Sequence, residues 1–300
     1  MLQKYNPANE NLVYSVNGQL FRRDQPGLSP FDSVVQGGDA VWEGLRLYQG
    51  RIFRLTEHLD RLRDSARALA FAEIPSHEAI IEAIRKTLAA NGMMDGVHIR
   101  LTLTRGVKVT SGMDPRLNRS GPTLIVLPEF KPPVYDKTGL KLATTSVRRP
   151  GPDVMDPKIH HNNLINSILA KIEANLAGAD DAVMLDGRGF VAETNATHLF
   201  LVKAGRLHTP RGIACPEGIT RSVVLELAEE LQIKAFVEDL SLVDFYRADE
   251  VFCTGTMGEL APVTMIDARP IGDGQIGHVT LRLSEAFARR VAVEGTRVVD

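Results

Sequence analysis

The alternation of hydrophobic and polar residues predicts strands and helices over the first half of the chain. LVYSVNGQLF predicts a hairpin with Asn17-Gly18 at its turn, because that pair accepts the positive φ angles of a tight turn. Apolar residues at helical spacing predict two scaffold helices, within residues 57–71 and 77–92. VHIRLTLTRG alternates without error, which predicts a strand with one apolar and one polar face.

The second half alternates between strand-like and helix-like segments. Strands are predicted in LKLATTSV, DAVMLD, THLFLV, KAFVEDL and EVFCTG, and helices in NNLINSILAKIEANLAG, ITRSVVLELAEELQI and residues 279–291. The first of these helices is expected to pack through an apolar stripe formed by Leu164, Ile165, Ile168, Leu169, Ile172 and Leu176. Such alternation predicts an α/β domain in which helices pack on a sheet.

A boundary between two domains would interrupt this periodicity, and KPPVYDKTG does so. It combines two prolines, a glycine and charge without apolar periodicity, as linkers do. We therefore expect a small N-terminal α/β domain (α+β) over residues 1–128, a linker over 129–139 and a larger C-terminal α/β domain over 140–300.

The composition favours small-molecule chemistry. The chain has 300 residues, 44% hydrophobic and 24% charged, as in soluble globular proteins, and its net charge of -2 gives no electrostatic case for nucleic acid or a membrane. The two cysteines, Cys215 and Cys253, form neither a CxxC pair nor a disulfide framework, which fits a reducing compartment. The N-terminus shows no apolar leader, and no stretch approaches the roughly 18 apolar residues of a membrane span. We expect a cytoplasmic protein without a metal site.

Lys158 and Glu193 are the candidate catalytic residues. Lys158 follows Pro157, just before a predicted helix, where its amine can form a Schiff base if the amine loses its proton easily. Glu193 follows a Gly-Arg-Gly turn, and its carboxylate would keep a pyridine nitrogen protonated, with Asn195 helping to orient it. An exposed lysine and a strand-end carboxylate are the alternatives.

Two turns are candidates for binding a phosphate. Gly218-Ile219-Thr220 precedes a helix, with Thr220 as its expected N-cap, and a helix N-terminus offers backbone N–H groups to an anion. In FCTGTMGEL, Thr254 and Thr256 follow a predicted strand and provide a second set of donors. The G-x-x-x-x-G-K pattern is absent, so a nucleoside triphosphate is not expected.

In this order, VAETNATHLF, PEGITR and ADEVFCTGTMGELAPV resemble the class IV aminotransferases, the fold-type IV pyridoxal phosphate enzymes. The resemblance covers nearly the whole chain. It implies pyridoxal 5'-phosphate as the cofactor, a two-domain fold, and a homodimer in which a second subunit completes the active site. It also implies that Lys158 carries the cofactor and moves the α-proton, and that Glu193 pairs with the pyridine nitrogen. The implied cofactor-binding positions are Arg54, Lys158, Glu193, Gly218, Ile219, Thr220 and Thr256.

Within that family, VWEGLR at residues 41–46 and Asn162 resemble the branched-chain enzymes. His98 and Asn163 stand where those enzymes usually have tyrosines, and Gly37 replaces a bulky aromatic residue. The substrate-binding candidates are Trp42, His98, Arg100, Asn163 and Met257. In the loop RGVKVTSGMDPRLNRSG, the candidate carboxylate binders are Lys108, Arg116 and Arg119.

The resemblance implies an aminotransferase that works by ping-pong half-reactions. The expected substrates are a branched-chain L-amino acid as donor and a 2-oxo acid such as 2-oxoglutarate as acceptor. The alternatives are a D-amino acid or (R)-selective amine transaminase and, more distantly, an aminodeoxychorismate lyase, whose elimination needs no second keto acid. A metabolite-binding protein without catalysis would leave the ordered polar turns unexplained.

Overall fold

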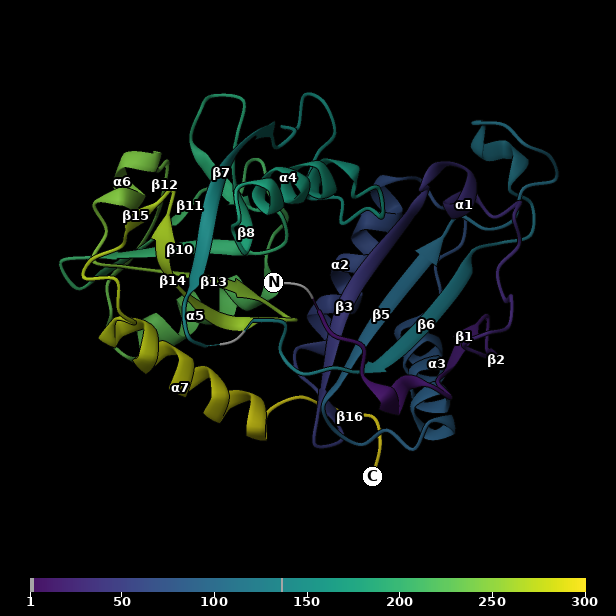
Figure 1. Ribbon diagram of the computed structural model, residues 1–300. Coiled ribbons are helices and arrows are strands. Elements are labelled where there is room, and N and C mark those ends of the chain that lie inside the picture. Colours follow the sequence, from purple (N-terminus) through teal and green to yellow (C-terminus); the bar gives the residue numbers. More distant parts are fainter. Residues whose placement is uncertain (1–2, 136) are drawn as a thin grey trace. The chain divides into compact units, whose positions relative to one another are not determined.

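The computed structural model describes residues 3–135 and 137–300, and Asp136, within the predicted linker, lies outside the described residues, as do residues 1–2. The chain forms two compact units (Figure 1). The N-terminal unit comprises Lys4–Pro132, Ile159–Asn163 and Val291–Asp300. The C-terminal unit contains Pro133–Lys158 and Leu164–Arg290.

These units group the residues differently from the predicted domain limits, which stay a prediction. Residues 159–163 and 291–300 contact the N-terminal unit, although the sequence division assigned them to the larger domain. Backbone pairing explains the difference. The Trp42 N–H donates to the His160 carbonyl at 3.0 Å, and Thr296 pairs with Ile52 in a short antiparallel ladder.

The N-terminal unit is built on an antiparallel sheet of seven strands. Their order is β16 (Thr296–Arg297), β4 (Arg51–Ile52), β3 (Ala40–Tyr48), β5 (Val97–Thr104), β6 (Thr123–Phe130), β1 (Val13–Val16) and β2 (Gln19–Arg22). The predicted hairpin is confirmed: β1 and β2 pair up to Val16 and Gln19, with positive φ at both Asn17 and Gly18. The polar face of β5 exists as predicted, but its side chains are buried as well, except for half-buried Arg100.

Helices α2 (Leu55–Ala68) and α3 (His77–Ala90) pack on this sheet (Figure 1). Their apolar stripes, including Leu59, Leu62 and Ile84, are fully buried in the unit's core, so both are the scaffold helices that the pattern predicts. The Ser76 side chain caps α3 by accepting from the Ala79 N–H. The other helical segments are η1 (Pro7–Asn9), α1 (Ser33–Gly37) and η2 (Pro115–Leu117).

The C-terminal unit has a mixed sheet of nine strands. Along the sheet lie β12 (Ala235–Glu238), β11 (Arg206–Pro210), β10 (His198–Lys203), β13 (Glu250–Gly255), β14 (Glu259–Ile266), β7 (Leu140–Arg148), β8 (Asp181–Leu185) and β9 (Val191–Thr194), and β15 (Arg269–Pro270) pairs with β14. Strand β9 also contacts β10, so the sheet curls back on itself. The helices are α4 (Ile165–Leu176), α5 (Ile219–Glu230), α6 (Leu242–Tyr246) and α7 (His278–Val293).

Helix α4 does not pack in the predicted way. Its buried residues are Ala170 and Ala174, which lie with Ala182 and Met184 of β8 in a small core cluster. Alanine allows the helix backbone to approach the sheet closely, so the large apolar residues lie elsewhere on the helix. Five residues of the predicted stripe are exposed, and we call them the α4 apolar surface: Ile165, Ile168, Leu169, Ile172 and Leu176, the last 84% exposed. A patch of this kind marks an interaction surface.

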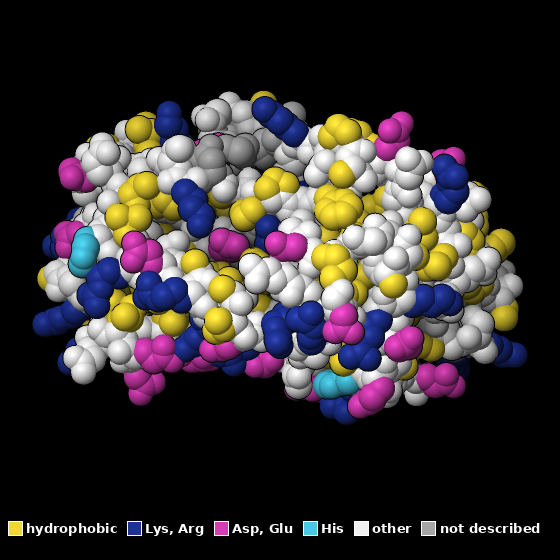
Figure 2. All heavy atoms as spheres, turned by 90° about the horizontal axis from the view of Figure 1, so that it is seen from below, with side chains coloured by type: hydrophobic (Ala, Val, Ile, Leu, Met, Phe, Trp, Pro, Cys, Tyr) yellow, Lys and Arg dark blue, Asp and Glu magenta, His cyan; other side chains and the backbone are white. Residues whose placement is uncertain are grey.

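Charge is mixed on one face of the molecule (Figure 2). On the face drawn in Figure 2, basic and acidic side chains are interspersed, as a net charge of -2 suggests. Among the described residues, no helix is both long and apolar enough to cross a membrane.

Candidate functional site

Glu193 is a buried acid held by an arginine. It lies on β9 opposite Met184 of β8, and the Arg149 Nη2 atom is 2.7 Å from Glu193 Oε1. The Arg149 side chain is only 12% exposed and the Glu193 side chain 7%. An arginine at this distance favours the ionised carboxylate. The Asn195 side chain accepts from the Ala182 N–H and so ties the turn after β9 to β8, and its role in orienting Glu193 stays a prediction.

The two predicted phosphate turns lie beside one residue, His198. Thr254 is opposite His198 in the β10–β13 ladder, and the His198 ring bonds to the Pro216 carbonyl at 2.8 Å. A Cβ atom at Gly218 would lie only 2.5 Å from the His198 ring, so this close approach requires glycine. The structure therefore brings the beginning of α5 and the end of β13 to the same place.

The start of α5 and the end of β13 offer hydrogen-bond donors that no side chain of the described residues is seen to accept from. Helix α5 begins at Ile219 with Gly218 as its N-cap residue, and no side chain caps it. The prediction of Thr220 as N-cap is wrong, because Thr220 already lies inside the first turn. The Thr254 hydroxyl is buried and has no hydrogen-bond partner among the described residues. Uncapped N–H groups and a buried hydroxyl suit a phosphate.

These observations fit pyridoxal phosphate. A buried carboxylate paired with arginine can accept a bond from a protonated ring nitrogen, and an uncapped helix N-terminus can hold the phosphate group. Half-buried Thr256 follows β13 directly, two residues after Thr254.

Lys158 lies in a turn of the connection between β7 and α4, not directly at the helix start. Its backbone N–H donates to Asp156 Oδ1 at 3.0 Å, and its side chain is exposed. The residue that follows it, Ile159, already belongs to the N-terminal unit.

Arg54 has an unusual backbone conformation at the start of α2. Its φ is 52° and its ψ 36°, in the left-handed region, and it is the N-cap residue although no side chain caps the helix. A bulky residue rarely adopts this conformation unless the surroundings impose it, and such strain is common at functional sites. Its Nη1 atom lies 3.0 Å from Glu57 Oε1.

Trp42, His98 and Arg100 share the polar face of β3 and β5. The Arg100 guanidinium lies 3.4 Å from the centre of the Trp42 ring and donates to Asn162 at 2.6 Å, and burial lowers its pKa to about 10. Burial, followed by the charges of Lys131, Arg100 and Arg46, lowers the pKa of His98 to about 3. His98 is therefore neutral at pH 7, and both of its buried ring nitrogens have no hydrogen-bond partner among the described residues. This face suits an anionic or hydrogen-bonding group.

The remaining substrate candidates are less constrained. Asn163 is exposed, 3.7 Å from where a Cβ atom at Gly38 would lie. A Cβ atom at Gly37 would meet nothing within 4 Å, so the space beside it is open. Met257, in the C-terminal unit, accepts through its carbonyl from the Val134 N–H at 3.0 Å.

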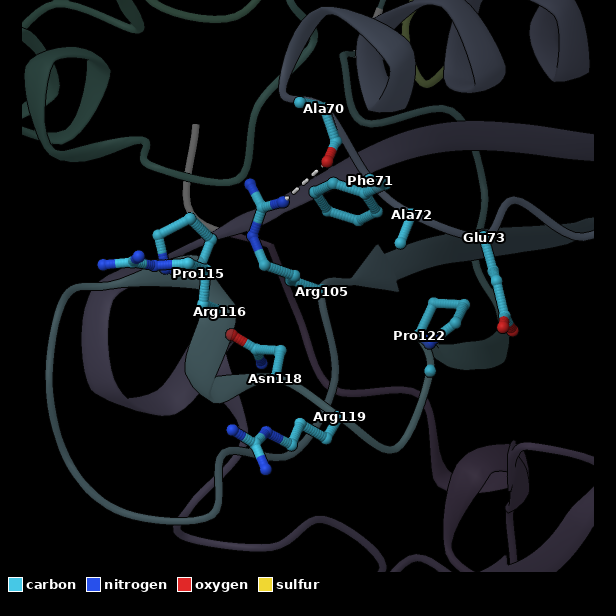
Figure 3. A pocket seen from close by; sticks show the side chains of 11 residues that line it. Ala70, Phe71, Ala72, Glu73, Arg105, Pro115, Arg116, Asn118, Arg119 and Pro122 are labelled. Carbon is cyan, nitrogen blue, oxygen red and sulfur yellow. Dashed lines mark hydrogen bonds between the residues drawn. The ribbon is translucent and has the colours of Figure 1, made fainter.

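A pocket of about 360 Å³ lies beside the long polar loop (Figure 3). Arg105, Arg116 and Arg119 line it, but Arg105 is paired with Asp39 and Arg116 with Asp114. The third loop candidate, Lys108, is directed to the Gly112 carbonyl. The pocket is lined by none of the predicted cofactor residues, so we do not assign the chemistry to it.

Sequence patterns did not indicate a buried cluster around Glu43. Its carboxylate is fully buried and contacts the His58 ring at 2.6 Å, Arg61 through two bonds of 2.8 and 2.7 Å, and the His160 ring at 3.1 Å. Burial alone would raise the pKa of Glu43, but the Arg61 and His160 charges and hydrogen bonds hold it well below its ordinary value. His160 also stacks on Trp42, so the cluster anchors the segment that follows Lys158.

We expect Glu43→Gln to lower the free energy of unfolding at pH 7 by about 3 kcal/mol, because it removes the charge that a buried ion pair needs. A depressed pKa stabilises the fold above the ordinary value of 4.5 and loses that contribution as pH falls through the depressed pKa. The difference between wild type and variant should therefore shrink below pH 4.5. Denaturant unfolding at a series of pH values measures it. The control is Asp64→Asn, which removes an exposed ion pair with Arg67 and should change the free energy of unfolding by less than about 1 kcal/mol. An equal loss in both variants would contradict a stabilising role for the buried Glu43 charge.

Among the described residues, no group of three or more His, Cys, Asp or Glu is placed to hold a metal ion.

Comparison with known proteins gives consistent matches. The family model "Amino-transferase class IV" matches residues 40–266. The branched-chain-amino-acid aminotransferase-like protein 2 of Arabidopsis thaliana is 56% identical over 94% of this chain and 51% of that protein. The chain therefore spans about half the length of that relative. The putative branched-chain-amino-acid aminotransferase of Methanocaldococcus jannaschii is 42% identical over 95% of this chain and 98% of that protein.

The fold also matches solved structures. A branched-chain amino acid aminotransferase from T.th., complexed with N-(5'-phosphopyridoxyl)-L-glutamate, superposes with a TM-score of 0.87 at 36% identity, and the match covers 94% of both chains. The predicted fold class, α/β of fold type IV, is thereby confirmed.

Proposed function

The chain belongs to the class IV aminotransferase family, and on that premise we propose that it is a pyridoxal-phosphate-dependent aminotransferase. It transfers an amino group from an amino acid to a 2-oxo acid in two half-reactions. The observation that carries the proposal is in the C-terminal unit: the buried Glu193–Arg149 pair, together with the uncapped start of α5 beside the Thr254 hydroxyl.

The bound cofactor supplies an electron sink for the substrate's α-carbon. The Lys158 amine would hold the cofactor and, once released from it by the substrate amine, would move the proton at that carbon, and Glu193 would accept a hydrogen bond from the ring nitrogen. The phosphate-binding residues are Arg54, Gly218, Ile219, Thr220 and Thr256. A guanidinium and helix N–H groups are strong phosphate donors.

The proposed donor is a branched-chain L-amino acid and the proposed acceptor 2-oxoglutarate. Relatives named as branched-chain aminotransferases support the donor, as does Trp42, whose ring gives an apolar wall. The half-buried guanidinium of Arg100, on the same face of β5 as His98, suits the carboxylate of an acceptor. Met257 and Asn163 complete the set of proposed substrate contacts.

Two alternatives to the branched-chain substrate remain, because His98 and Asn163 stand where branched-chain enzymes usually have tyrosines. One is transamination of D-amino acids or (R)-amines, and the other is elimination from aminodeoxychorismate. The test is product formation from L-leucine, D-alanine, an (R)-amine and aminodeoxychorismate, each with and without 2-oxoglutarate. The proposal expects L-leucine alone to give at most one equivalent of 4-methyl-2-oxopentanoate per subunit, and continued production only when 2-oxoglutarate is present. Pyruvate from aminodeoxychorismate without a keto acid would replace it with the lyase.

We also propose that the active form is a cytoplasmic homodimer. The free, buried thiols of Cys215 and Cys253 fit a reducing compartment. The α4 apolar surface supports the dimer, because apolar patches of this kind are usually covered by a partner.

Charges on the α4 apolar surface should therefore dissociate the dimer. Ile168→Glu combined with Ile172→Glu places two carboxylates where the proposed interface requires apolar contact. We expect light scattering to report a dimer for the wild type and a monomer for the variant. Met113→Glu, at a fully exposed residue outside this surface, should remain dimeric. A dimeric double variant would contradict the proposed surface, and a monomeric wild type would contradict the dimer itself.

A further inference from the structure

The buried contact between Arg149 and Glu193 links three parts of the C-terminal unit. Besides the 2.7 Å contact with Glu193, the Arg149 side chain donates to the Ala214 carbonyl, to Asn166 Oδ1 at 3.2 Å and to Ser167 Oγ at 3.4 Å. Its own N–H donates to the Leu185 carbonyl of β8. The guanidinium, which follows β7 in the chain, is therefore held by β9, the start of α4 and the loop that precedes α5.

The charges around Arg149 indicate that it stabilises the ionised form of Glu193. A carboxylate that is as buried as Glu193 would be unstable in its ionised form without a nearby cation. Cys215 lies close enough to sense both residues, and burial followed by the Glu193 charge raises its pKa to about 12. The thiol therefore stays neutral. Arg149 supplies the cation that contacts Glu193 directly.

We infer that Arg149 is a positioning residue of the proposed active site: it keeps Glu193 ionised and fixed in place, and through Glu193 it keeps the ring nitrogen of the cofactor protonated. This inference rests on the proposed function. Arg149 acts through Glu193, so its removal should have the same consequence as neutralising Glu193. At this point the sequence has two arginines in succession, Arg148 and Arg149, and does not indicate which of them faces the acid.

The test compares Arg149→Met with Arg148→Met. Arg148 is exposed and its guanidinium donates to the carbonyls of Thr145 and Ser146, not to Glu193 in any bond of the described residues, so it is a matched control. Each protein is loaded with pyridoxal phosphate labelled with ¹⁵N in the ring, and the nitrogen chemical shift reports whether the ring is protonated. We expect a protonated nitrogen in the wild type and in Arg148→Met, and an unprotonated one in Arg149→Met. Arg149→Gln, which retains donors without charge, repeats the test if the methionine variant does not fold.

Rates provide the second readout. Arg149→Met and Glu193→Gln should each slow removal of the α-proton by about 100-fold, and the double variant should be no slower, because both act on one nitrogen. Arg149→Lys, which keeps the charge, should recover most of the rate. A protonated ring nitrogen in Arg149→Met, or losses that multiply in the double variant, would overturn the inference. A wild type that binds no pyridoxal phosphate would refute the proposed function instead.

Discussion

Replacing Lys158 with alanine is expected to abolish turnover while leaving the fold intact. The amine is proposed both to hold the cofactor and to transfer the α-proton, and acid–base catalysis alone contributes roughly 10²–10⁴-fold. We therefore expect a loss of at least about 10³-fold in kcat. The fold should persist because the Lys158 side chain is exposed and its hydrogen bond to Asp156 uses the backbone.

Steady-state kinetics and thermal unfolding of the same preparation measure both effects. Lys141→Ala provides the control, because Lys141 is also an exposed lysine of the C-terminal unit. It should retain wild-type kcat. If Lys158→Ala retained more than about a tenth of the wild-type rate, the lysine would not be the catalytic base.

The second large effect is expected at Glu193. Glutamine has the shape of glutamate but no charge, so Glu193→Gln should bind pyridoxal phosphate and yet remove the α-proton about 100-fold more slowly. The reason is that a neutral amide does not stabilise a protonated ring nitrogen. Single-turnover mixing with α-deuterated and unlabelled L-leucine measures this step directly.

Glu173→Gln serves as the matched change in the same unit, because Glu173 is only partly buried and bonds to Ser146. Its single-turnover rate should equal that of the wild type. An unchanged rate in Glu193→Gln would remove Glu193 from the proposed mechanism.

Local patterns predicted the elements well where the apolar face of an element is also the face that packs in the core. The Asn17-Gly18 hairpin and the stripes of α2 and α3 follow from turn chemistry and helical spacing. Helix α4 shows where this reasoning fails. Its large apolar residues suggested a buried face, but the two alanines give the closer fit to the sheet. Periodicity shows that a helix has an apolar face, but not whether the same chain covers that face.

The candidate site was predictable from the sequence only in part. Local context and the resemblance together identified Lys158 and Glu193, and the roles of both stay predictions. The contact from Arg149 to Glu193 and the cluster around Glu43 could not be read from the sequence. Both join residues from different elements, and a local pattern carries no information on which charged side chains meet in a folded chain. The close approach of Gly218 to the His198 ring also joins two different elements, so it too could not be predicted from the sequence.

The visible absorbance spectrum of the purified protein with pyridoxal phosphate tests the central claim most directly. It is recorded alone, after L-leucine and, separately, after D-alanine. The proposal predicts a visible band that L-leucine removes, that D-alanine leaves unchanged and that 2-oxoglutarate restores. Loss with D-alanine alone would move the protein to the D-amino acid branch of the family. A protein that remains colourless after addition of pyridoxal phosphate would contradict the account as a whole.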